Sequence, residues 1–129
     1  ILARKYFDRL RVRTTHVDAP AWSLSGGNQQ KIAIAKWLAS QCDILMMDEP
    51  TRGVDVGAKA EIHALIDQLA REGTAILLVS SELPEVLNLS TRIVVLREGR
   101  KMGELSRKDA DQESLMRLMA GVESSSNIQ

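Results

Sequence analysis

Two short apolar runs with an amphipathic segment between them constrain the fold more than any other feature. The runs, Ile44–Met47 and Thr74–Val79, have the length of strands, and Gly73 stands where a helix would end. The apolar stripe between them consists of Ala58, Ile62, Leu65, Ile66 and Leu69. Strand, helix and strand in this order are typical of an α/β fold with a largely parallel sheet and flanking helices. Such strands are usually buried on both faces, so we expect both runs, including Met46 and Met47, to lie in the core.

The rest of the sequence extends this alternation. Residues 1–12 are typical of the end of a helix and residues 14–20 of a polar connector, because Pro20 forbids a continuous helix there. The other expected elements are a helix from Ser25 to about Ser40, a short helix ending at Leu89, strands at Arg92–Leu96 and Lys101–Leu105 joined by a tight turn, and a helix at Asp109–Met119 with Leu115, Leu118 and Met119 inward. Residues 122–129 are expected to form a disordered tail.

Charge and composition argue against one class of function. The sequence has 17 basic and 17 acidic residues, so it lacks the basic surplus with which nucleic-acid binders neutralise phosphates. Aromatic residues make up 3%, too few for a base-stacking platform. The single cysteine, Cys42, leaves no intrachain disulfide and no multi-cysteine metal cluster. We therefore expect no nucleic-acid partner.

The tripeptide Ser25-Gly26-Gly27 precedes a helical pattern and is the first candidate for binding chemistry. The first N–H groups of a helix have no intrahelical partners and lie at the positive end of its dipole. Glycines let an anion approach that backbone closely, and the serine hydroxyl adds a donor. The plainer interpretation, an N-cap with a flexible approach, remains open at this point.

Asp48 and Glu49, at the end of the first apolar run, are the second candidate. Open α/β sheets bind ligands at the carboxyl ends of their strands. Asp48 could hold Mg²⁺, which prefers carboxylate and phosphate oxygens, and Glu49 could orient a water for attack on a γ-phosphate. A solvated carboxylate pair at a strand end is the alternative.

Taken together, these segments closely resemble the ATP-binding cassette (ABC) ATPases. The resemblance rests on Leu24–Lys31, a helix, and then Ile44–Thr51. It implies a P-loop NTPase fold and assigns roles to individual residues. Ser25, Gly26, Gly27 and Asn28 would belong to the signature motif that binds nucleotide, Ile44–Asp48 would be the Walker B strand with Asp48 at the metal, Glu49 would be the catalytic glutamate, and Asp55 would lie in the D-loop.

The stretch Pro50–Lys59 resembles one branch of that family more closely. This branch is the second cassette of the tandem ATPases that power bacterial monosaccharide importers of the ribose, xylose and galactose type. The resemblance implies an ATP hydrolase that uses ATP and Mg²⁺ to drive sugar uptake. Its implied partners are the first cassette of the same polypeptide, an integral-membrane sugar permease and, indirectly, a periplasmic sugar-binding protein. Its implied place is the cytoplasmic side of the bacterial inner membrane, as a peripheral subunit. The sugar itself is not identified.

One motif of the family is missing from this sequence. No Gly-x-x-x-x-Gly-Lys-[Ser/Thr] loop, which cradles the nucleotide phosphates, occurs in it. The family has that loop upstream of the signature, so we expect the C-terminal half of a cassette, without the Walker A portion. Residues 1–22 would then be the end of a helical subdomain with a connector, and residues 23–121 the C-terminal part of the ATPase domain. We expect this chain to be inactive alone, and missing sheet neighbours favour self-association.

A second departure concerns Ser81, which occupies the position where the family has its switch histidine. A serine hydroxyl can bind a γ-phosphate but cannot carry an imidazole's proton or charge, so the resemblance makes Ser81 a catalytic-site residue of a slow or regulatory site. A helix-capping role for Ser80 and Ser81 is the alternative. Two other functions stay open: a chromosome-maintenance or repair ATPase, and a degenerate nucleotide-sensing module. Arg52 could reach a phosphate or bind Asp55.

Overall fold

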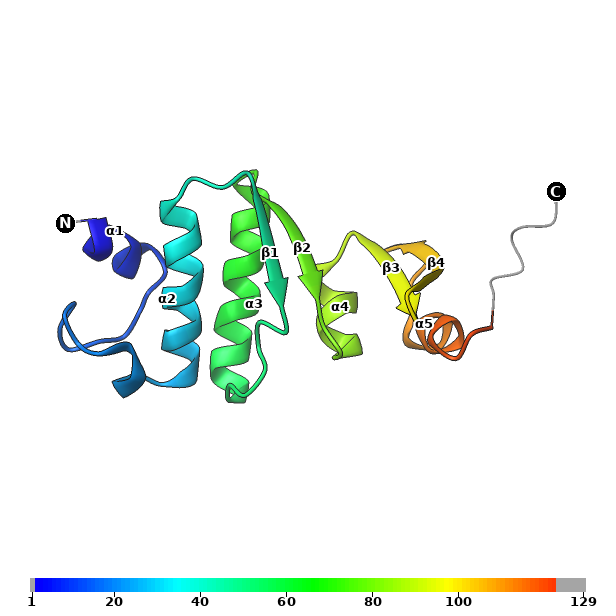
Figure 1. The fold of residues 1–129 in the computed structure, drawn as a ribbon, viewed down its shortest axis with the longest axis horizontal. Helices are drawn as coiled ribbons and strands as arrows, with labels where there is room; N and C mark the ends of the chain where they lie inside the picture. Colours follow the sequence, from blue (N-terminus) through cyan, green and yellow to red (C-terminus); the bar gives the residue numbers. More distant parts are fainter. Residues whose placement is uncertain (1, 123–129) are drawn as a thin grey trace. The chain divides into compact units, whose positions relative to one another are not determined.

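The computed structural model describes residues 2–122, which form two compact units. The first unit ends at Val79 and the second begins at Ser80 (Figure 1), a boundary within the expected 23–121 domain. The first unit contains α1 (Leu2–Arg9), the 3-10 turn η1 (Ala21–Ser23), α2 (Gly26–Ala39), β1 (Ile44–Asp48), α3 (Val56–Arg71) and β2 (Ala75–Val79). The second contains α4 (Leu83–Leu89), β3 (Arg92–Arg97), β4 (Arg100–Ser106) and α5 (Gln112–Met119). The expected tail, apart from Val122, lies outside the described residues.

The predicted crossover is present in the first unit. β1 and β2 are parallel neighbours, paired from Ile44 with Ala75 to Asp48 with Val79, and α3 connects them. Helices α2 and α3 run side by side (Figure 1), and α3 also packs against β2. The unit therefore has the α/β arrangement that the sequence predicts.

The prediction that these strands are buried on both faces is wrong for the described residues. In β1, Leu45 and Met47 are buried, whereas Ile44 and Met46 are 63% and 72% exposed. In a strand, successive side chains point to opposite faces. One face of β1 thus lies in the core and the other is open, which places Met46 on the surface.

The ends of α3 follow from local side-chain chemistry. Asp55 caps its N-terminus, where the carboxylate accepts a hydrogen bond from the Ala58 N–H at 2.8 Å. Gly73, with φ of 100°, lets the chain reverse, so that the Thr74 N–H bonds the Leu69 carbonyl at 3.0 Å. The chain then enters β2 directly.

The second unit is a hairpin with a helix on one face. β3 and β4 are antiparallel, and Glu98 and Gly99, with φ of 50° and 76°, make the turn between them. Among the described residues, β3 pairs with β4 alone, so the parallel part of the fold is confined to β1 and β2. The core of this unit consists of Ile93, Val95, Leu115 and Leu118. Met119 was expected to point inward but is 48% exposed.

Candidate functional site

The carboxyl end of β1 carries the two predicted carboxylates. Asp48 is the last residue of the strand and is exposed, and Glu49 follows it half-buried with φ of 47°. The Glu49 N–H donates a hydrogen bond to the Val79 carbonyl at 2.8 Å, which ties the turn to the end of β2. Left-handed backbone is uncommon for a residue with a Cβ. The chain thus leaves the sheet sharply, and both carboxylates stand at the edge where α/β sheets bind ligands.

Ser25 is the N-cap of α2, as predicted. Its Oγ accepts hydrogen bonds from the backbone N–H of Asn28 at 3.4 Å and from Asn28 Nδ2 at 3.0 Å. The capping interpretation of Ser25 is therefore confirmed, but it does not displace the anion-binding interpretation, because the orphan N–H groups of a first helical turn remain at the same place.

The two adjacent glycines differ in surroundings. Gly27 is buried, and a Cβ added to it would lie 2.5 Å from the Cβ of Ala58 on α3. Gly26 is exposed, and its added Cβ would make only an ordinary contact, 3.5 Å from the Gly53 carbonyl oxygen. Gly27 therefore lets α2 approach α3, a packing role that the sequence pattern did not reveal.

This close approach brings the first turns of α2 and α3 together around a small polar cavity of about 160 Å³. Its lining residues are Arg13, Ser25, Gly27, Asn28, Asp55, Gly57, Ala58 and Glu61. Pockets that enclose drug-sized ligands have about 300 Å³ or more. This surface can therefore contact one end of a nucleotide but cannot enclose a whole one.

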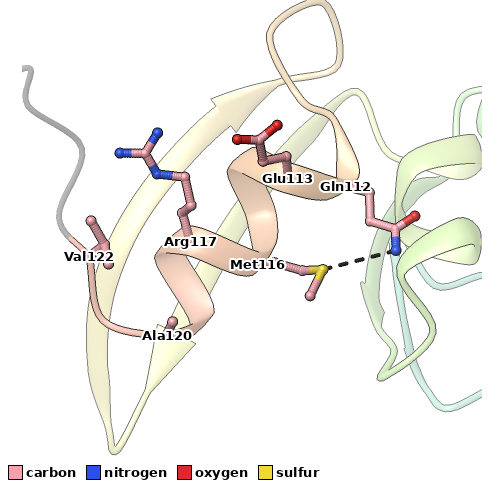
Figure 2. A pocket seen from close by; sticks show the side chains of 6 residues that line it. All are labelled: Gln112, Glu113, Met116, Arg117, Ala120 and Val122. Carbon is pink, nitrogen blue, oxygen red and sulfur yellow. Dashed lines mark hydrogen bonds between the residues drawn. The ribbon is translucent and has the colours of Figure 1, made fainter.

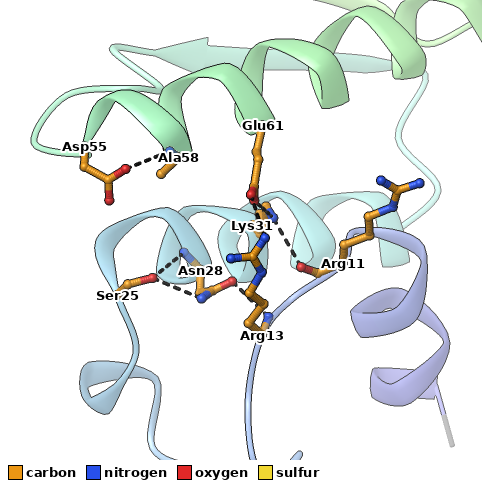
Figure 3. A network of polar contacts seen from close by, with 8 residues as sticks. All are labelled: Arg11, Arg13, Ser25, Asn28, Lys31, Asp55, Ala58 and Glu61. Atoms are coloured by element: carbon orange, nitrogen blue, oxygen red, sulfur yellow. Dashed lines mark hydrogen bonds and ion pairs between the residues drawn. The ribbon is translucent and has the colours of Figure 1, made fainter.

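A network of polar contacts lies beside this cavity (Figure 3). Lys31, only 4% exposed, donates from Nζ to Glu61 Oε2 at 2.6 Å and to the Arg11 carbonyl at 3.2 Å. Arg13 binds the other Glu61 oxygen at 3.0 Å through its guanidinium. The backbone N–H of Arg13 donates a hydrogen bond to Asn28 Oδ1 at 3.0 Å. The network thus joins the segment that follows α1 to both α2 and α3.

The electrostatics of this network follow from those contacts. The hydrogen bond from Lys31, and then its charge, hold the pKa of the Glu61 carboxyl below its usual value, with a smaller contribution from Arg13. Burial and the neighbouring Asp55 charge raise the pKa of this carboxyl but do not outweigh the effect of Lys31. Glu61 is therefore held as a carboxylate between two cations.

Sequence reasoning missed Lys31 and Glu61, although a signal for Lys31 was present. Lys31 lies one turn before Ala35 and two before Leu38, on the apolar side of α2. A lysine buried on such a stripe needs a partner for its charge. The identity of that partner, 30 residues further along the chain, carries no local signal.

Ser81 belongs to the second unit and is exposed. Next to it, the Ser80 Oγ accepts a hydrogen bond from the Glu82 N–H at 3.1 Å, so Ser80 stabilises the approach to α4. The proposed phosphate-binding role of Ser81 remains a prediction.

A second cavity, of about 500 Å³, lies along α5 and the turn after it (Figure 2). It is lined by Gln112, Glu113, Met116, Arg117, Ala120 and Val122. None of the predicted site residues is among them, and a weak side-chain hydrogen bond joins Gln112 Nε2 to Met116 Sδ at 3.9 Å.

Residues 2–122 contain neither a cluster of metal-ligating side chains nor a membrane-spanning helix. In this part of the chain, no three His, Cys, Asp or Glu side chains converge as a metal site. A single carboxylate such as Asp48, at the end of β1, fits the way in which Mg²⁺ is commonly held, by one or two carboxylates together with phosphate oxygens. No described helix is both long and apolar enough to cross a bilayer.

Comparisons with known sequences agree on one family. The sequence model described as "ABC transporter" matches residues 2–52. The "Putative ribose/galactose/methyl galactoside import ATP-binding protein 2" of Burkholderia cenocepacia (strain HI2424) is 60% identical over 122 residues, which are 95% of this chain and 24% of that protein. "Ribose import ATP-binding protein RbsA 1" of Rhizobium meliloti (strain 1021) is 47% identical over the same shares. The chain thus spans about a quarter of the length of these curated relatives.

Solved structures share the fold. A putative metal-chelate type ABC transporter in an inward-facing conformation matches 92% of this chain and 48% of its own, with a TM-score of 0.78 and 22% identity. The ADP conformation of MJ1267, an ATP-binding cassette of an ABC transporter, matches 92% of this chain and 44% of its own, with a TM-score of 0.74 and 25% identity. The α/β cassette fold expected from the sequence is therefore confirmed.

Proposed function

We propose, from the premise that this chain belongs to the ATP-binding cassette family of ABC transporters, that it forms part of the ATP-binding subunit of a sugar importer. The observation that carries this proposal is the 60% identity over 122 residues to a protein named for ribose and galactose import. The geometry supports this proposal. The signature residues Ser25–Asn28 lie at the start of α2, and Asp48 and Glu49 lie at the carboxyl end of β1, and both positions are suited to phosphate chemistry. The complete subunit would couple ATP hydrolysis to carbohydrate uptake.

The residues of this chain would serve two different nucleotides. Cassettes in this family pair head to tail, so Ser25, Gly26, Gly27 and Asn28 would complete a site whose phosphate loop lies in the first cassette of the same polypeptide. The N–H groups at the start of α2 and the Ser25 hydroxyl would bind the terminal phosphate there. Asp55, at the start of α3, borders the same cavity.

Asp48 and Glu49 would serve the other site, whose phosphate loop needs residues outside this sequence. Asp48 would hold Mg²⁺, which supplies charge neutralisation at the phosphates when bound. Glu49 would orient the attacking water, and its fixed backbone, bonded to Val79, keeps the carboxylate at the sheet edge. With serine at position 81, this site would turn over slowly or act as a regulator.

Partners and location follow from the same proposal. The relatives are named import ATP-binding proteins. We therefore place the subunit on the cytoplasmic side of the bacterial inner membrane, bound to a sugar permease. A periplasmic sugar-binding protein would deliver the sugar to this permease. These relatives are named for sugar import and not for chromosome maintenance or repair.

A chimaera tests the proposal. Residues 1–122 replace the aligned stretch of the Burkholderia relative, and the protein is assayed with its permease in single-turnover ATP hydrolysis. Ser25→Arg should abolish turnover at the site of the first cassette, because a bulky cation would fill the phosphate position. Glu49→Gln should have the smaller effect. Equal losses from both substitutions would refute the division of roles, and an inactive unmutated chimaera would refute the function.

The chain alone gives a second test. Without a phosphate loop, its 129 residues should bind Mg-ATP only weakly. Equilibrium titration measures this directly, and micromolar affinity would contradict the proposal.

A further inference from the structure

A series of contacts connects Glu61, on the second turn of α3, to the signature serine at the start of α2. Glu61 binds the Arg13 guanidinium, the Arg13 N–H binds Asn28 Oδ1, and Asn28 Nδ2 binds Ser25 Oγ, each at 3.0 Å. Every one of these contacts lies within the first unit (Figure 3). Glu61 is thus connected to Ser25 through Arg13 and Asn28, although it makes no direct contact with the serine.

The buried charge of Lys31 holds this series in place. Removing an ammonium from water is costly unless it is paired and hydrogen-bonded, and Lys31 meets that need with Glu61 at 2.6 Å and with the Arg11 carbonyl at 3.2 Å. One Glu61 oxygen is thereby fixed, and the other faces Arg13. Arg11 and Arg13, in the segment between α1 and η1, are both anchored by these contacts, so the backbone N–H of Arg13 has a defined direction.

That direction decides how the Asn28 amide is turned. An N–H donor can face only the amide oxygen, so Oδ1 must point to Arg13 and Nδ2 must point to Ser25. The Ser25 oxygen then accepts two hydrogen bonds, one from Nδ2 and one from the Asn28 backbone N–H. A hydroxyl has two acceptor positions and one donor, so the Ser25 hydrogen remains to be donated outward.

We propose that Glu61 is a positioning residue, which acts through Arg13 and Asn28 to fix the Ser25 hydroxyl as a hydrogen-bond donor to an anion. The structural part of this proposal stands on the contacts alone, whereas its effect on ATP turnover rests on the proposed function. The lowered pKa of the Glu61 carboxyl is consistent with a carboxylate held between Lys31 and Arg13.

The matched variants are Glu61→Gln and Glu72→Gln. Lys31 and Arg13 bind different oxygens of Glu61, and a glutamine at position 61 would replace one of these acceptors by an NH2 donor, which cannot pair with a cation. Glu72, the C-cap residue of the same helix, pairs with Arg9 and so also ties the N-terminal segment to α3, but without a connection to Ser25. Arg13→Met offers a milder version, since the Arg13 side chain is 79% exposed and its N–H is kept.

Spectra of the 129-residue chain test the structural part without any ATPase activity. In Glu61→Gln and in Arg13→Met, the Asn28 side-chain amide resonances should shift, and the backbone amide at position 13 should exchange with solvent about tenfold faster, as expected when a hydrogen bond is loosened. Glu72→Gln should change neither. Unchanged Asn28 resonances and unchanged amide exchange at position 13 in both Glu61→Gln and Arg13→Met would overturn the proposal.

Kinetics of the chimaera test the consequence. Glu61→Gln should lower kcat about tenfold, below the roughly hundredfold that a misplacement of 1 Å can cost, with little change in KM for ATP. Glu72→Gln should leave both constants unchanged. In an Asn28→Ala background, Glu61→Gln should cause no further loss, because the connection is already broken; a further tenfold loss would overturn the proposed route. An unmutated chimaera without ATPase activity would refute the proposed function, and the spectra would still decide the positioning.

Discussion

Replacing Gly27 with alanine should force α2 and α3 apart. The added Cβ would lie 2.5 Å from the Ala58 Cβ, whereas apolar carbons make their best contact at about 3.5–4.0 Å. Both atoms are rigidly attached to helix backbone, so the helices must move by about 1 Å or more. Overpacking of this kind costs about 1–3 kcal/mol.

Gly26→Ala is the matched control for this prediction. It gains the same helix propensity, about 1 kcal/mol, but its Cβ makes only ordinary contacts, at 3.5 Å with Gly53 and 3.7 Å with Val54. The gain in helix propensity is the same in both variants, so it cancels when their stabilities are compared. The difference in their free energies of unfolding should therefore isolate the clash, at about 1–3 kcal/mol.

Urea unfolding followed by tryptophan fluorescence measures this difference. Both tryptophans of the sequence, Trp22 and Trp37, lie in the first unit, so the signal reports on that unit. Introducing Ala58→Gly into the Gly27→Ala variant should remove most of the clash. Equal stability of the Gly26→Ala and Gly27→Ala variants would refute the packing argument.

Two further predictions concern the second unit, where hydrogen exchange of the β3 amides reports on stability. Leu118→Ala should destabilise it by about 2–5 kcal/mol, because Leu118 is 3% exposed and packs over Gly103; unchanged β3 exchange would contradict this. Asp111 caps α5 and accepts a hydrogen bond from the Ser114 N–H, which lowers the pKa of its carboxyl. Because the pKa is lowered in the folded state, the stabilisation that the Asp111 carboxylate contributes is fully present above the pKa of the unfolded chain, about 3.9. This stabilisation is lost as the pH falls through the pKa of the folded state. Asp111→Asn should therefore reduce the acid sensitivity of β3 exchange below about pH 4, and identical pH profiles would contradict the assignment.

The elements of the first unit could be predicted because their signals are local. Ser25 and Asp55 stand at helix starts and Gly73 at a helix end, where side-chain or backbone conformation alone favours those positions. The same locality explains why Asp48 and Glu49 could be placed at a strand end from the sequence. Their roles, and that of Ser81, remain predictions.

Burial and pairing could not be predicted because they depend on distant parts of the chain. The apolar run Ile44–Met47 does not indicate how many of its faces are covered, and in the described residues Met46 stands on the open face. Arg13 and Glu61 are 48 residues apart, and nothing near either one indicates the other. The packing role of Gly27 likewise depends on Ala58, which another helix presents.

The left-handed backbone at Glu49 favours glycine, whereas the role proposed for this residue requires a carboxylate. A residue with a Cβ is disfavoured there by about 1 kcal/mol, a penalty that glycine avoids and asparagine reduces. Glycine at this position would relax the chain but remove the carboxylate. Homologues that do not require the acid should therefore drift towards glycine or asparagine, so the residue found at this position would indicate in which lineages the catalytic role proposed for Glu49 is under selection.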